Sequence, residues 1–186
     1  MVVGQRMTEE AYQRFVLSTM EARWELHDGV LVEKPGRTWE HGAIVSDLGF
    51  LLQNSLDRTD YRVFFGLRVR RPPATIFVPD VMVVPTSYGD EFRDQPDILA
   101  IFAAPLPLVV EGWSPLMHGY DVDAKLPVYK ERGDLEIWRI HPYERTLTRW
   151  VRQSDGSYRE TLHRGGTVSA AALPNVTIDL DSLFDV

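Results

Sequence analysis

Residues 78–84 are VPDVMVV and residues 106–115 are LPLVVEGWSP, two apolar runs that each carry a single acid. Both runs are rich in β-branched and leucine side chains and have the length of a buried strand. Asp80 stands near the start of the first run, and Glu111 ends the hydrocarbon part of the second. A carboxylate beside buried strands is unfavourable unless a cation or a metal ion accompanies it. The two acids are therefore the first candidates for a functional site.

The segments on either side of these runs predict an α/β protein. Before them, we expect a helix capped by Thr8 and reaching about Met20, a hairpin turning at Asp28-Gly29, and a helix over residues 38–57. The remaining expected elements are strands over 61–70, 76–84 and 106–111, a helix over 121–132 that Gly133 ends, and strands over 135–141, 146–151 and 158–162. This order predicts a mixed, curved β-sheet flanked by helices, with additional antiparallel hairpins.

The length and composition are those of one globular domain. The chain has 186 residues, of which 44% are hydrophobic and 25% charged, and we expect a single domain over residues 1–186. Its sequence has no apolar run of membrane-spanning length and no signal peptide pattern. It contains no cysteine, so thiolate chemistry and disulfides are excluded. We expect a cytoplasmic protein that does not bind membranes.

The net charge of −7 argues against a protein that coats nucleic acid by bulk attraction. It does not exclude a nuclease, because a metal ion held by acidic groups can face a phosphate. Arg68, Arg70 and Arg71 form the densest basic patch in the sequence. They are either a local phosphate contact or a solvated strand end, and the second alternative is favoured for such a short run.

Asp80 and Glu111 predict a metal site if their strands are neighbours, because Mg²⁺ prefers oxygen ligands and two carboxylates suffice when a phosphate supplies more. Lys125 offers two alternatives. It follows Asp121 by four residues, so the two could form an ordinary ion pair on a helix. Its ammonium could instead point at the metal site, orient or deprotonate a water and offset charge on the phosphate.

Two further side chains are weaker candidates for the same site. His41 falls in the first turn of the second expected helix, where it could be exposed or could contact a phosphate and carry a proton. Glu33 ends the first hairpin and could be a third metal carboxylate or an ordinary exposed acid. The sequence has no zincin, P-loop or serine-hydrolase motif, which leaves those enzyme classes without support.

The spacing of these residues resembles that of a known family. The matching features are the Pro79-Asp80 pair, Glu111 followed by Ser114-Pro115, the series Asp121, Lys125, Tyr129 and Gly133, and the run Glu136-Ile137-Trp138. Together with the hairpin 24–33 and the helix around His41, they are similar to the Uma family of restriction-endonuclease-like proteins, within the PD-(D/E)XK nuclease superfamily. The resemblance extends over about residues 8–151.

The resemblance implies a restriction-endonuclease-like core with Mg²⁺, or Mn²⁺, at Asp80 and Glu111. The superfamily lysine usually stands two residues after the glutamate, where this chain has Trp113. In the Uma family the lysine has migrated to the following helix, which matches Lys125. The family also suggests a homodimer, and the aromatic residues Trp138, Tyr143 and Trp150 could form its surface or belong to the core.

Two functions follow from the sequence. The first is a metal-dependent endonuclease that hydrolyses DNA phosphodiester bonds, with RNA left open as a substrate. Asp80 and Glu111 would hold the metal and Lys125 would assist the attacking water, with Glu33 and His41 at the edge. The alternative is a catalytically silent relative that serves as a binding or oligomeric module. The acidic net charge favours this alternative, and the Asp-Glu-Lys set favours the enzyme.

Overall fold

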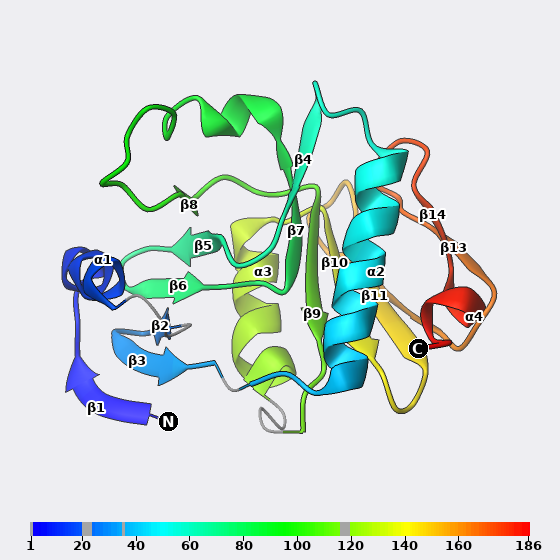
Figure 1. Cartoon of the computed structure of the whole chain (residues 1–186), viewed down its shortest axis with the longest axis horizontal. Coiled ribbons are helices and arrows are strands. Elements are labelled where there is room, and N and C mark those ends of the chain that lie inside the picture. Colours follow the sequence, from blue (N-terminus) through cyan, green and yellow to red (C-terminus); the bar gives the residue numbers. More distant parts are fainter. Residues whose placement is uncertain (1, 20–23, 35, 116–119) are drawn as a thin grey trace.

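The computed structural model describes residues 2–19, 24–34, 36–115 and 120–186, and its described strands form two six-stranded sheets and a small two-stranded sheet (Figure 1). The N-terminal sheet contains, in spatial order, β1 (Val2–Arg6), β3 (Val30–Glu33), β2 (Trp24–His27), β6 (Thr75–Phe77), β5 (Arg68–Arg71) and β8 (Ile101–Phe102). The central sheet contains β12 (Tyr158–His163), β11 (Thr146–Arg152), β10 (Glu136–His141), β9 (Leu108–Gly112), β7 (Val81–Pro85) and β4 (Tyr61–Phe64). The small sheet pairs β13 (Thr167–Ser169) with β14 (Thr177–Asp179). Both large sheets are mixed, since β9 and β10 are parallel, as are β5 and β8.

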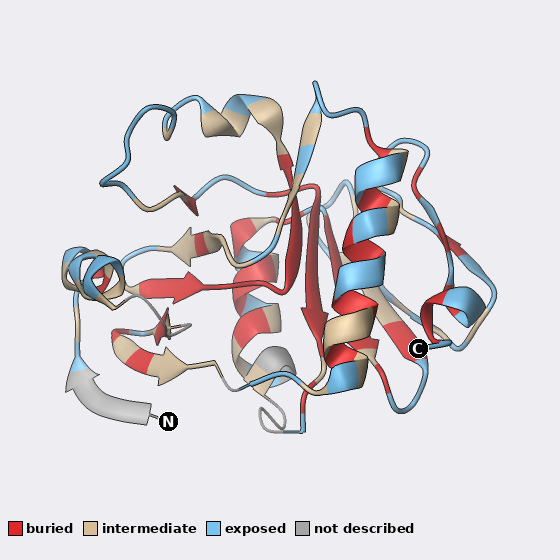
Figure 2. Cartoon of the chain, in the orientation of Figure 1, coloured by how far each residue is buried: buried red, intermediate tan, exposed pale blue. Residues whose placement is uncertain are grey.

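The helices are α1 (Glu9–Ser18), α2 (Trp39–Ser55), α3 (Leu126–Arg132) and α4 (Leu180–Leu183), with a 3₁₀ turn η1 (Thr86–Gly89) and a π turn η2 (Asp121–Lys125). None of the helices in the described part of the chain is long and apolar enough to cross a membrane. Helix α2 packs on one face of the central sheet and α3 on the other. Strand β7 divides its side chains between them, because Val81 and Val83 join the α2 side while Met82 and Val84 join the α3 side. The strands between these helices are buried on both faces (Figure 2).

Local sequence signals place several elements where they were expected. Thr8 and Thr38 accept backbone hydrogen bonds at the starts of α1 and α2. Asp28 and Gly29 both have positive φ, 48° and 81°, as a tight hairpin turn requires. Gly133 ends α3 in the left-handed region with a φ of 78°. The α/β fold class with mixed sheets and flanking helices is confirmed.

Two predicted strands are wrong in their extent, and the difference positions the site. The strand expected over 61–70 is two strands, β4 in the central sheet and β5 in the N-terminal sheet, separated at Gly66 with a φ of 75°. The strand expected over 76–84 is likewise split into β6 and β7. Pro79 lies in that break and has no N–H to donate to a ladder. Asp80 therefore lies where the chain passes from one sheet to the other.

The late hairpin of β10 and β11 belongs mainly to the core. Trp138 is fully buried and Trp150 nearly so, which confirms the core alternative for these two rings. Tyr143, at the turn of the hairpin, is 52% exposed. The hairpin therefore leaves one of the three aromatic residues available at the surface.

Candidate active site

Asp80 is buried and its carboxylate is surrounded by donors from three segments. Oδ2 accepts the backbone N–H of Gly112 at 2.9 Å and lies 3.0 Å from Nε2 of His41, in the first turn of α2. Oδ1 accepts from Nζ of Lys34 at 3.1 Å and from Nη2 of Arg37 at 3.0 Å. Both cations come from the connection between β3 and α2. The Asp80 carboxylate is thus fixed by two cations, an imidazole and an amide.

These neighbours keep Asp80 ionised. Burial by itself would raise the pKa of the Asp80 carboxyl, because a charge is costly away from water. The Lys34 ammonium and the His41 imidazole outweigh that effect and hold the pKa of Asp80 well below its usual range. The site consequently presents a carboxylate, rather than a carboxylic acid, at neutral pH.

Glu111 is the second acid of the site, and it is 3% exposed in β9. Its Oε1 accepts from the Tyr129 hydroxyl at 2.5 Å and from Nζ of Lys125 at 3.0 Å. The same Nζ lies 2.9 Å from Oε1 of Glu25, in β2. Lys125 therefore joins an acid of the N-terminal sheet to an acid of the central sheet.

The side chain of Lys125 is fully buried in the protein. Its side chain has no exposed surface, and Nζ lies 5.8 Å and 5.7 Å from the ring centroids of Phe77 and Tyr120. Of the two sequence-based alternatives, the one in which Lys125 points at the acidic site is the one the structure displays. The side chain of Asp121, the proposed ion-pair partner, lies outside the described residues.

The two candidate metal ligands lie close together because their strands are neighbours. Val81 and Val110 are register partners of β7 and β9, and the Asp80 N–H donates to the Val110 carbonyl. Nζ of Lys34 lies 3.1 Å from Asp80 Oδ1, 3.8 Å from Glu111 Oε2 and 2.7 Å from the Val78 carbonyl oxygen. One ammonium thus contacts three oxygens that converge on the same point between the carboxylates.

The structure brings together Asp80, Glu111, Lys125 and His41, but it does not bring Glu33 to them. In the β2–β3 register Glu33 is opposite Trp24, whereas Glu25 is opposite Val32. Since neighbouring residues of a strand face opposite sides, Glu33 and Glu25 lie on different faces of the hairpin. No hydrogen bond or ion pair among the described residues joins Glu33 to the cluster. Its catalytic role stays a prediction.

Glu25, Lys34 and Arg37 are cluster residues that the sequence did not single out, and Tyr129 was noted only as part of the spacing that resembles the family. Glu25 is fully buried and accepts the Val78 N–H at 2.9 Å through Oε1, and its Oε2 has no hydrogen-bond partner among the residues that the structure describes. Its local sequence, Trp24-Glu25-Leu26-His27, has the alternation of an ordinary half-exposed strand and gives no signal of burial. Nothing in the local sequence distinguishes Lys34 or Arg37 from solvated cations, because their partner Asp80 is more than forty residues away.

Two of the three arginines of the sequence patch form ion pairs, and Arg68 donates to the Tyr12 hydroxyl at 3.0 Å. Arg70 pairs with Glu9, and Arg71 pairs with both Asp28 and Glu131. These are partly exposed ion pairs, which add little net positive charge to the surface. The solvated alternative for this patch matches the structure better.

An aromatic cluster borders the site on the side of β10. The Trp113 ring stacks on His141 with centroids 4.2 Å apart, and the Tyr143 ring meets both edge-on. The Tyr143 hydroxyl donates to Glu40 Oε2 at 3.0 Å, which ties the hairpin turn to the start of α2. Trp113, two residues after Glu111, therefore belongs to a ring stack with His141 and Tyr143.

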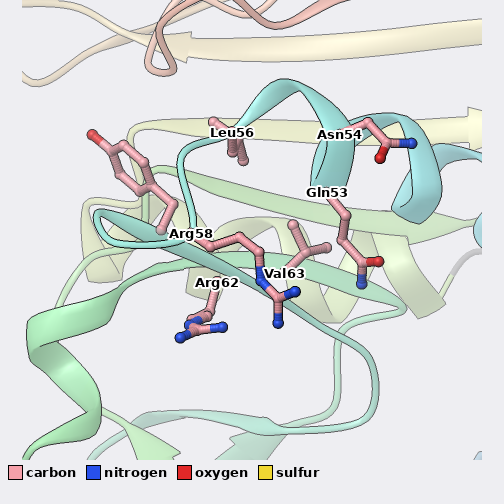
Figure 3. Close-up of a pocket in the computed structure, with 7 residues that line it drawn as sticks. Gln53, Asn54, Leu56, Arg58, Arg62 and Val63 are labelled. Atoms are coloured by element: carbon pink, nitrogen blue, oxygen red, sulfur yellow. The ribbon is translucent and has the colours of Figure 1, made fainter.

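A separate pocket of about 240 Å³ lies at the other end of α2 (Figure 3). It is lined by Gln53, Asn54, Leu56, Arg58, Tyr61, Arg62 and Val63. Gln53 follows His41 by twelve residues on the same helix, which corresponds to about 18 Å of helix length. This polar pocket is thus distinct from the acidic cluster.

The fold is a mixed α/β fold with helices on both faces of its central sheet, and a buried acid–lysine cluster lies between the two large sheets. The chain belongs to the Uma2 family, whose description is "Putative restriction endonuclease" and whose model matches residues 9–181. A solved structure described as a "putative nuclease belonging to DUF820", from Anabaena variabilis ATCC 29413, has the same fold with a TM-score of 0.76. The two sequences are 20% identical, and the match covers 96% of this chain and 97% of that one. Among curated proteins, none matches this chain.

Proposed function

We propose that the chain is a divalent-metal-dependent endonuclease that hydrolyses phosphodiester bonds in DNA. The observation that carries the proposal is the meeting of the Asp80 and Glu111 carboxylates around one cationic group, although the two acids are thirty-one residues apart in the sequence. The family description and the similar nuclease structure support the nuclease class. The metal and the DNA substrate are our inference from the chemistry of the cluster.

The donor set fits a hard divalent cation. The Lys34 ammonium already lies among oxygens of Asp80, Glu111 and the Val78 carbonyl, so this point favours positive charge. Within the described residues, no group of three or more His, Asp and Glu side chains could hold a metal ion. If Mg²⁺ or Mn²⁺ binds here, the two carboxylates would hold it, with water and substrate oxygens completing its shell.

A bound Mg²⁺ or Mn²⁺ would supply Lewis-acid stabilisation of the phosphate and a more acidic water. The protein groups around it have separate tasks. His41 and the Gly112 N–H fix the orientation of Asp80. Lys125 and Tyr129 fix Glu111, and the Lys125 charge contributes a positive potential to the space where phosphate charge accumulates. Because its Nζ is held by two carboxylates, Lys125 serves better as a charge donor than as a base.

The test is a cleavage assay on plasmid DNA, single-stranded DNA and RNA with Mg²⁺, Mn²⁺ or EDTA. Wild type should cleave DNA with metal and be inactive in EDTA. Asp80→Asn and Glu111→Gln should each lower turnover by about 10²–10³-fold, the scale of losing one transition-state electrostatic group. Glu91→Gln, an exposed acid outside the cluster, is the matched control.

Glu33→Gln in the same assay decides whether Glu33 takes part in catalysis. Cleavage that persists in Asp80→Asn would contradict the proposal.

One observation favours the alternative of a catalytically silent module. Every acid of the cluster has a cationic partner, so the network is internally neutralised and could be structural. In that case the wild type cleaves neither DNA nor RNA, and calorimetry detects no Mn²⁺ binding. Binding of Mn²⁺ that is lost in Glu111→Gln would instead favour the enzyme.

We also propose a homodimer, because two sites would suit cleavage of both strands of a duplex. Sedimentation equilibrium of the wild type measures the assembly directly. A monomer at all accessible concentrations would contradict this proposal and leave the nuclease proposal intact.

A further inference from the structure

We infer that Lys34 is a positioning residue, a tethered ammonium that occupies the cation position between Asp80 and Glu111 in the metal-free protein and must withdraw when a divalent ion binds. This inference rests on the metal site proposed above, but its test does not require nuclease activity. It concerns how the carboxylates are kept together before any metal arrives.

The contacts of Lys34 are those of a cation rather than of a surface lysine. Its side chain is 9% exposed, and Nζ lies within 4 Å of both carboxylates while also donating to the Val78 carbonyl at 2.7 Å. Two carboxylates at such a short separation repel each other unless positive charge stands between them. The Lys34 ammonium supplies that charge at the point where a metal ion would be held.

No other cation of the cluster has the same position. Arg37 contacts the same oxygen of Asp80, but among the described residues it forms no ion pair with Glu111, and its side chain is 26% exposed. Lys125 contacts Glu111 through Oε1, whereas Lys34 approaches Oε2. Lys34 alone among the described cations lies between the two proposed ligands.

The tether allows withdrawal. Lys34 directly follows β3, whose last residue is Glu33, and precedes the Thr38 cap of α2, so it belongs to a connection rather than to a regular element. A lysine stem has four rotatable carbon–carbon bonds, and rotation about them moves the ammonium without moving the backbone. A divalent ion carries twice the charge of the Lys34 ammonium and can coordinate both carboxylates at once, so it can displace the ammonium.

The placement predicts opposite effects on stability and on metal binding. Lys34→Met keeps most of the side-chain volume and removes the charge. It should lower the thermal midpoint in EDTA, because the two carboxylates then face each other without an intervening cation. It should raise the affinity for Mn²⁺ by roughly 10- to 100-fold, the scale of removing one like charge about 4 Å away in a partly solvated site. Mn²⁺ should therefore raise the midpoint of Lys34→Met by more than that of the wild type.

The variant is expected to fold, since Asp80 keeps Arg37 and His41 and Glu111 keeps Lys125 and Tyr129. Lys34→Arg retains the charge, so it should keep the midpoint in EDTA and bind Mn²⁺ no more tightly than the wild type. Lys130→Met is the matched control, because Nζ of Lys130 lies over the rings of Trp150 and Tyr158 and forms no ion pair with either acid among the described residues. It should leave the Mn²⁺ affinity unchanged.

The experiment is isothermal calorimetry with Mn²⁺ in the absence of nucleic acid, with thermal melts in EDTA and in Mn²⁺. A lower midpoint in EDTA together with tighter Mn²⁺ binding in Lys34→Met supports the inference, even if no variant cleaves DNA. Equal or weaker Mn²⁺ binding by a folded Lys34→Met overturns it, even if the wild type is an active nuclease. Failure of both proteins to bind Mn²⁺ also overturns it.

Discussion

Gly112 is a glycine because the residue after Glu111 lies against the histidine and aspartate of the site. A Cβ there would be 2.6 Å from Nε2 of His41, 2.8 Å from its Cδ2 and 3.4 Å from Oδ2 of Asp80. Gly112→Ala should therefore break the His41–Asp80 contact and cost about 1–3 kcal/mol, the usual range for overpacking. Urea denaturation measures the difference. Gly42→Ala is the control, because nothing lies within 4 Å of its added Cβ and alanine favours the interior of α2. Equal stability of the two variants would contradict the argument.

The shared pairing of Lys125 makes a second prediction. Lys125→Met leaves Glu25 and Glu111 buried without their common cation, and it should lower the free energy of unfolding by about 3–5 kcal/mol. Adding Glu25→Gln removes one of the stranded charges and should restore part of the loss. Chemical denaturation of the two single variants and the double variant gives the coupling energy. Strict additivity would mean that the Lys125–Glu25 contact contributes nothing.

At the scale of single residues, the sequence predicted the acids that interrupt apolar runs and missed those in mixed strands. Asp80 and Glu111 were identifiable because a charge next to five or six apolar residues requires a partner. Glu25 was not, because Trp24-Glu25-Leu26-His27 has the alternation of an ordinary half-exposed strand. Its burial comes from the sheet neighbour β6 and from Lys125, a hundred residues later. Local pattern carries no information about either.

At the scale of elements, the sequence predicted types well and sheet membership poorly. Several of the correct predictions rest on local signals, in which a residue acts on the backbone within a few residues of itself. These are the caps at Thr8 and Thr38, the Asp28-Gly29 turn and the helix end at Gly133. The assignment of β4, β5, β6 and β7 to two sheets depends on pairing with distant strands. Gly66 and Pro79 did mark the two breaks, although both residues also occur inside bulged or edge strands.

The edge strand of the central sheet, β12, carries a pH-sensitive residue. The Tyr158 hydroxyl donates to the Asp134 carbonyl at 2.7 Å. Burial, followed by the negative charge of Asp134, raises the pKa of Tyr158 from 10.0 to about 12. The folded protein thus holds the phenol proton over a range in which the unfolded chain releases it. The contribution of the protonated Tyr158 hydroxyl to the free energy of unfolding is fully present below pH 10 and is lost as the pH rises to about 12.

Tyr158→Phe should consequently flatten the alkaline part of the stability curve. Below pH 10 the variant should be less stable by about 0.5–1.5 kcal/mol, because it lacks one hydrogen bond. Between pH 10 and about 12 the two unfolding curves should converge. Denaturant midpoints measured across this range test the prediction. A constant difference at every pH would exclude Tyr158 as the source of alkaline destabilisation.

At the scale of the whole molecule, Arg132 joins the two large sheets. Its guanidinium pairs with Asp134, whose Oδ1 accepts the Leu106 N–H just before β9. It also donates to four carbonyl oxygens of the N-terminal sheet and the loop after it, those of Arg70, Phe102, Ala103 and Ala104. One side chain at the end of α3 therefore satisfies acceptors of both layers.

Arg132→Met should destabilise the protein by about 3–5 kcal/mol, because Asp134 and several carbonyls lose their buried donor. The loss of protection against hydrogen exchange should differ between the two large sheets. Amides of β5 and β8 should exchange with solvent faster than those of β9 and β10, and hydrogen exchange followed by mass spectrometry resolves these strands. Arg159→Met, an exposed arginine on β12, is the control. Uniform loss of protection in both sheets would show that Arg132 does not act locally on the N-terminal sheet.

The pairing of Glu25 with Lys125 also has a consequence for synthesis of the chain. At translation rates of about 5–20 residues per second, a hundred residues take roughly 5–20 s to add. During that interval Glu25, and later Asp80 and Glu111, have been made while the lysine that binds two of them has not. The two Lys125 ion pairs cannot form before Lys125 has been added, so a shorter nascent chain contains Glu25, Asp80 and Glu111 without the lysine that pairs with two of them.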